Sequence, residues 1–157
     1  MSNRYEELAS RLGLEFLPDT ERPAEADLES LERQLAHRLP DEYKDFLRKL
    51  AFSRASGLCF RFTDSPNIEG GGVEVFFGIR PNDDYDLMEN WEGMQGRVPE
   101  GLLPFADSPG GLLCLSLRKS DYGAVYWWGF EHSRPRDREL YFVAPTFHDF
   151  LYGLYLE

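Results

Sequence analysis

Residues 103–131 read LPFADSPGGLLCLSLRKSDYGAVYWWGFE, and this stretch decides the fold that the sequence predicts. Within it, Leu112–Arg118 places three leucines on one side and a cysteine and a serine on the other, which is typical of a strand with one buried face. A polar loop, Lys119–Gly123, leads to Ala124–Phe130, which is rich in aromatic and β-branched residues. We therefore expect a β-hairpin, which the chain enters from Leu103–Ala106 through a turn at residues 107–111.

Because a hairpin this apolar is not stable alone in water, other elements must cover it. Alternation and β-propensity predict further strands at Leu58–Thr63, Val73–Ile79 and Leu140–Ala144. Apolar residues spaced three or four apart predict helices at Asn3–Leu12, Ala24–Leu39 and Pro40–Leu50, a short helix capped by Asp83 or Asp84, and a closing helix from Thr146 whose buried stripe runs to Leu154. Separate runs of helices and strands indicate a single α+β domain over residues 1–157, with an antiparallel sheet packed against N-terminal helices and a C-terminal helix. The expected core includes Tyr43, Phe46, Leu47, Leu113, Leu115, Leu117, Phe150 and Leu151.

Composition limits the classes of partner. The chain has 157 residues, 42% of them hydrophobic, and a net charge of −11. Nucleic acids and anionic membranes attract lysine and arginine, so this charge disfavours both as direct partners and suits a basic protein. No apolar run approaches the roughly 20 residues that cross a bilayer, and residues 1–7 lack the apolar segment of a signal peptide. We expect a cytoplasmic protein.

Nothing in the sequence points to catalysis, a cofactor or a metal. His37, His132 and His148 lie in different elements without ligand spacing, and the first and last are expected at the surface. Cys59 and Cys114 lie in apolar strands and are expected to be buried free thiols rather than a disulfide. The three glycines at 70–72 favour a flexible hairpin loop over a phosphate cradle, because a strand follows them and no Lys-Ser/Thr pair does.

The consecutive residues Trp127 and Trp128 point to opposite faces of their strand. Either the second one lies under the C-terminal helix or a loop, or it is partly exposed at a binding surface, where tryptophan is enriched.

The strongest candidate for a binding surface is the acidic segment DDYDLMENWE, residues 83–92, which contains five acids and no base. Acidic groups around aromatic side chains suit the capture of a basic protein surface, since the charges speed association and the aromatics supply affinity. The alternative is a solvated acidic turn whose Leu87, Met88 and Trp91 only pack inward. The candidate partner-binding residues are Asp83, Asp84, Tyr85, Asp86, Glu89, Trp91 and Glu92.

The order of motifs resembles the SUKH superfamily, which includes bacterial toxin-immunity proteins and a fungal regulator of cell-wall synthesis. The resemblance lies in the helix at 24–35, the run LPDEYKDFL at 39–47, the blocks LPFA at 103–106, GG at 110–111 and VYWW at 125–128, and the closing FxxFL at 147–151. The chain departs from the family where residues 51–57, AFSRASG, replace the usual Asn-Gly-Gly. The resemblance implies an α+β fold that has no catalysis of its own and binds a protein.

Two functions follow from this resemblance. The first is an immunity protein that binds and neutralises a partner toxin, frequently a nuclease. The second is a regulatory or scaffolding module whose protein partner is not a toxin. A neighbouring gene for a toxin with a variable C-terminal domain would favour the first.

Overall fold

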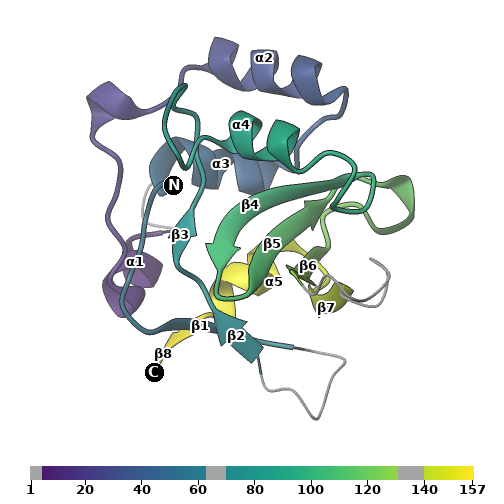
Figure 1. Ribbon diagram of the computed structural model, residues 1–157. Coiled ribbons are helices and arrows are strands. Elements are labelled where there is room, and N and C mark those ends of the chain that lie inside the picture. Colours follow the sequence, from purple (N-terminus) through teal and green to yellow (C-terminus); the bar gives the residue numbers. More distant parts are fainter. Residues whose placement is uncertain (1–4, 63–69, 131–139) are drawn as a thin grey trace.

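The computed structural model describes residues 5–62, 70–130 and 140–157, which form two antiparallel sheets with helices packed against them (Figure 1). One sheet has five strands in the order β3-β4-β5-β6-β7, and the other has three in the order β2-β1-β8. The α+β class predicted from the sequence is confirmed, but its single sheet is divided in two. None of the helices in these residues is long and apolar enough to cross a membrane.

The helices follow the predicted periodicity and end earlier than predicted in several places. They are α1 (Glu6–Leu12), α2 (Glu25–Leu35), α3 (Asp41–Lys49), α4 (Leu87–Gly93) and α5 (Phe147–Tyr152), with 3-10 turns at Asp19–Glu21 and Lys119–Asp121. Helix α2 stops at Leu35 because Ala36 takes a left-handed conformation, with φ of 59°. Leu39 and Leu154, expected on helical stripes, are buried just beyond the ends of α2 and α5.

The five-stranded sheet contains β3 (Val75–Phe76), β4 (Leu102–Ser108), β5 (Gly111–Ser116), β6 (Val125–Gly129) and β7 (Leu140–Ala144). The predicted hairpin is β5–β6, in which Leu113 pairs with Trp127. The segment expected only to enter this hairpin is itself the strand β4, between β3 and β5. Pro104 is accommodated there because the register between β4 and β5 shifts directly after it, at a bulge.

Strand β5 is buried on both faces, so the prediction of one buried and one polar face is wrong. Ser116, on the side of the strand opposite the leucines, is 0% exposed, and so is Cys114, which the sequence predicts to be a buried thiol. Ser116 tolerates this burial because its hydroxyl donates a hydrogen bond to the carboxylate of Asp121, which comes from the loop before β6.

The three-stranded sheet joins β1 (Leu58–Arg61) to β2 (Gly70–Gly72) on one side and to β8 (Tyr155–Leu156) on the other. The glycines expected in a flexible loop therefore form a strand. A Cβ on Gly70 would lie 1.8 Å from the carbonyl oxygen of Phe60, so β2 can approach β1 this closely only with glycine. Of the predicted strand Val73–Ile79, only the two residues of β3 form a strand. The predicted strand Leu58–Thr63 corresponds to β1, and its last residue, Thr63, lies outside the described residues.

Aromatic side chains from both halves of the chain meet in the core. Phe46 of α3 contacts Phe76 of β3 and Phe147 of α5, with ring centroids 4.8 and 5.2 Å apart. Phe105 of β4 packs edge-on against Tyr43 and Phe147. All eight side chains predicted to form the core are buried: Tyr43, Phe46, Leu47, Leu113, Leu115, Leu117, Phe150 and Leu151.

The two neighbouring tryptophans differ in burial. Trp128 is 3% exposed and lies under the guanidinium of Arg97, 5.9 Å from the ring centroid, in the segment that follows α4. Trp127 is half-buried, and its indole N–H donates to Ser108 Oγ at 2.9 Å. Trp128 is therefore the tryptophan that a loop residue covers, Trp127 is the partly exposed one, and a binding role for Trp127 stays a prediction.

Cysteines and histidines follow the expectations in part. Both cysteines are free thiols, and Cys114 is buried, which raises the pKa of its thiol. Cys59 is only half-buried, contrary to the prediction, because it lies in the small three-stranded sheet. His37 and His148 are exposed as predicted, and His132 lies outside the described residues.

Candidate partner-binding surface

The acidic segment folds as a tight turn followed by helix α4. Asp86, and not Asp83 or Asp84, caps this helix: its Oδ2 accepts from the Glu89 backbone N–H at 3.0 Å. Its other oxygen, Oδ1, accepts from the Arg80 backbone N–H at 2.7 Å. Asp86 is 5% exposed, so its carboxylate fixes the turn and does not form part of the surface.

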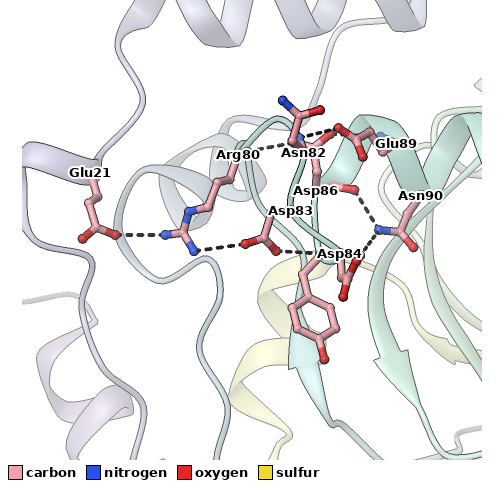
Figure 2. A network of polar contacts seen from close by, with 9 residues as sticks. Glu21, Arg80, Asn82, Asp83, Asp84, Asp86, Glu89 and Asn90 are labelled. Atoms are coloured by element: carbon pink, nitrogen blue, oxygen red, sulfur yellow. Dashed lines mark hydrogen bonds and ion pairs between the residues drawn. The ribbon is translucent and has the colours of Figure 1, made fainter.

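Arg80 supplies the base that the segment itself lacks. Its guanidinium lies 2.9 Å from Glu21 and 3.7 Å from Asp83, and Figure 2 shows it between the two carboxylates. The same guanidinium stacks on Phe52, 3.8 Å from the ring centroid. Arg80 therefore connects the acidic turn to the N-terminal 3-10 turn and to the residues after α3, which restricts the orientation of the turn.

Tyr85 is held against the body of the protein. Its backbone N–H donates to Asp83 Oδ1 at 2.8 Å, as in an Asx turn. Its ring stacks on Phe77 with an interplanar angle of 12°, and the Arg54 guanidinium lies 5.2 Å from the ring centroid. Tyr85 is consequently half-buried: its ring packs on the buried Phe77 and still has some solvent-exposed surface.

Asn90 and Glu89 complete the frame of the turn. The Asn90 side-chain amide donates to the backbone oxygens of Asp84 at 3.0 Å and Asp86 at 2.8 Å (Figure 2). The Glu89 carboxylate accepts from the Asn82 backbone N–H at 2.6 Å. The turn is thus fixed by hydrogen bonds along its whole length, and a side chain on it has a defined direction.

Three carboxylates of the segment face solvent: Asp84, Glu89 and Glu92. In the described part of the chain, no lysine or arginine forms an ion pair with any of them. Trp91 lies half-buried between Asn90 and Glu92 on α4. The segment therefore presents unneutralised negative charge next to an aromatic side chain, on a rigid support.

Trp91 also borders a groove with a volume of about 580 Å³. The groove lies between the end of α2, the segment from α4 to β4, and the residue after β5. No local pattern in the sequence indicates this groove, because its walls come from three separate parts of the chain. It is lined by Leu35, His37, Trp91, Gln95, Gly96, Val98, Pro99, Glu100, Gly101, Leu102 and Leu117.

The seven residues predicted as a site therefore divide into two groups. Asp83, Tyr85 and Asp86 hold the turn in place, whereas Asp84, Glu89 and Glu92 are exposed and Trp91 is half-buried. The capping of α4 by Asp86 could have been recognised in the sequence, since Asp86 and Glu89 have the spacing of a capping box. Among the described residues, no group of three or more His, Cys, Asp and Glu side chains is placed to hold a metal ion.

Comparisons with known proteins agree with this fold. The family model of the SMI1/KNR4 family (SUKH-1) matches residues 22–153. The chain is also 28% identical, over 143 residues, to the SPbeta prophage-derived uncharacterized protein YokK of Bacillus subtilis (strain 168), an alignment that covers 81% of this chain and 72% of that protein. The match to the family model spans α2 to α5, with the whole five-stranded sheet and with β1 and β2 of the other, and the chain accordingly belongs to the SMI1/KNR4 family (SUKH-1).

Proposed function

We propose that this chain is a non-catalytic protein-binding module, an immunity protein that binds and neutralises a cognate toxin whose toxic domain is basic, such as a nuclease domain. Membership of the SUKH-1 family supports a protein-binding role. The net charge of −11 supports a basic partner over an acidic one.

The proposal rests on the exposed, unpaired carboxylates on the surface of α4 and the turn before it. Asp84 and Glu92 are exposed there, and the described residues place no lysine or arginine in an ion pair with either. Unpaired surface carboxylates speed the encounter with a basic protein, and an adjacent aromatic side chain supplies buried contact area once the two proteins meet. The fixed backbone of the turn reduces the entropy that binding costs.

A first experiment tests the toxin partner. Where a toxin gene lies beside this one, its toxin domain is expressed in cells with and without this chain. We expect survival and a stable complex on gel filtration when both are present. Continued killing in the presence of folded chain, or capture of a non-toxin partner alone, would favour the regulatory or scaffolding module.

A second experiment tests the surface. Asp84→Lys/Glu92→Lys changes two side chains that make no contact needed by the turn, whereas reversal of Asp83 or Asp86 would remove contacts that hold it. With the partner immobilised, the double variant is expected to associate about tenfold more slowly at low salt and to lose much of its salt dependence.

The matched control is Glu7→Lys/Glu15→Lys, which makes the same change in net charge at exposed positions on and just after α1. It should associate nearly as fast as the parent protein. Equal slowing in both double variants would show that only the net charge matters and would place the interface elsewhere.

A further inference from the structure

The groove beside Trp91 has an apolar base and a polar rim. Leu35, Leu102 and Leu117 are buried side chains that reach it from α2, β4 and the end of β5. His37, Gln95 and Glu100 are exposed residues of its lining. Its volume of about 580 Å³ lies within the range of sites that enclose a ligand or the side chains of a partner.

The acidic and basic side chains of the lining are unevenly distributed. Glu100 is its only carboxylate, and no lysine or arginine belongs to its lining. The exposed Glu92 follows Trp91 directly on the neighbouring helix. A positively charged side chain is therefore the complementary occupant.

Two arginines beside the groove, Arg97 and Arg118, make their contacts outside it. Arg97 lies over the ring of Trp128. Arg118 is held by Asp121, to which its Nε donates at 3.1 Å. It packs so closely on Gly101 that a Cβ there would lie 2.5 Å from its Cγ. Gly101 has a φ of 85°, so a glycine at this position both permits the turn and leaves room for Arg118 beside the groove.

We propose that this groove accepts an arginine side chain of the partner protein, whose methylene stem packs on Leu35, Leu102 and Leu117 and whose guanidinium lies against Trp91 within reach of Glu100. Arginine fits better than lysine because its planar, weakly hydrated guanidinium stacks on an indole and pairs with a carboxylate at the same time. Its long stem suits the apolar base of the groove. This inference rests on the proposed function, for which it names the anchoring side chain.

The test uses short peptides and the whole chain, so it does not require the partner. Acetyl-Gly-Arg-Gly-amide is titrated into ¹⁵N-labelled protein at physiological ionic strength, and the backbone amides of Gln95, Gly96 and Gly101 are followed together with the Trp91 indole N–H. The lysine peptide controls for charge alone, and the citrulline peptide controls for shape without charge. We expect saturable shifts at the groove with arginine, weaker shifts with lysine and none with citrulline.

Two variants assign the contacts. Glu100→Gln should weaken the arginine peptide by roughly two- to fivefold, the effect of an exposed ion pair, and Trp91→Leu by at least as much, while Glu7→Gln should leave binding unchanged. Shifts confined to residues 84–90 and absent from Trp91 and Gly101, equal binding of arginine and citrulline peptides, or no shift at any concentration would each overturn the inference. None of these outcomes would affect complex formation with the intact partner, so failure of the groove is distinguishable from failure of the proposed function.

Discussion

The phenol of Tyr126 on β6 donates a hydrogen bond to the carboxylate of Asp121, at 2.5 Å, five residues earlier in the chain. The same carboxylate accepts from the buried hydroxyl of Ser116 at the end of β5 and from the Arg118 guanidinium. Asp121 therefore ties together both strands of the central hairpin and the loop between them. Each of the three donors would be left without this partner if the carboxylate were lost.

Acid should weaken the protein through this carboxylate. Burial by itself would raise the pKa of Asp121, but hydrogen bonds from Arg118, Ser116 and Tyr126 outweigh it and hold that pKa well below its usual value. A carboxyl whose pKa is lowered by folding adds stability that is fully present above its unfolded pKa of about 3.9 and is lost as the pH falls further. We expect Asp121→Asn to be less stable than the parent at pH 7 in urea unfolding, by about 1–3 kcal/mol.

The difference between the two proteins should then narrow as the pH is lowered through 4 and below, because the parent carboxyl also becomes protonated. A difference that stays constant over this range would show that Asp121 does not carry the acid sensitivity. Asp149→Asn, at an exposed position on α5, is a suitable control and should change the pH profile little.

The ring of Phe46 lies at the centre of the core, and its loss should be costly. It is 0% exposed and contacts three rings, which come from the residue before α1, from β3 and from α5: Tyr5, Phe76 and Phe147. Phe46→Ala should lower the free energy of unfolding by about 3–5 kcal/mol. Tyr152→Ala removes an aromatic side chain that is 38% exposed and should cost far less. Thermal melts within a degree or two of the parent for Phe46→Ala would contradict the position of α3 in the core.

Periodicity predicted α3 and its three buried residues because a helix on a sheet must present one apolar stripe, and Tyr43, Phe46 and Leu47 have that spacing. Strand β4 was missed because Pro104 is unusual inside a sheet, and only the bulge beside it makes the strand possible. Strand β8 consists of Tyr155–Leu156 and is set by pairing with β1, almost a hundred residues earlier, which no local pattern reports.

The sequence predicts which residues belong to the candidate site but not how their side chains are arranged in space. The acids and aromatics of residues 83–92 are contiguous in sequence, so the segment was visible. Which acids face solvent depends on Arg80 and on the capping by Asp86, and the groove depends on Leu35, Trp91 and Leu117 meeting in space. Such relationships arise from tertiary packing and have no local signature.

The two neighbouring acids Asp84 and Asp86 should differ sharply when truncated. Asp86→Ala removes the cap of α4 and the acceptor of the Arg80 backbone N–H, two partly buried hydrogen bonds, and should cost about 1–2 kcal/mol. Asp86→Asn, which retains an acceptor oxygen, should recover part of this loss. Asp84→Ala, at an exposed position, should change the free energy of unfolding by less than about 0.5 kcal/mol. Equal effects of the two alanine variants in urea unfolding would show that the turn is not held by Asp86.

A pair of glycine substitutions tests the close approach of β2 to β1. A Cβ on Gly70 would lie 1.8 Å from the Phe60 carbonyl oxygen, a backbone atom that cannot move away without breaking the strand pairing. Gly70→Ala should therefore open the small sheet and raise hydrogen–deuterium exchange in Leu58–Arg61, while the five-stranded sheet keeps its protection.

Gly93→Ala is the matched control: no atom lies within 4 Å of the added Cβ at the end of α4, and its φ is not positive. Since alanine restricts the unfolded chain and favours the helix, Gly93→Ala should stabilise the protein by about 0.4–1 kcal/mol. Unchanged exchange in Leu58–Arg61 for Gly70→Ala would mean that β2 does not need to lie so close to β1.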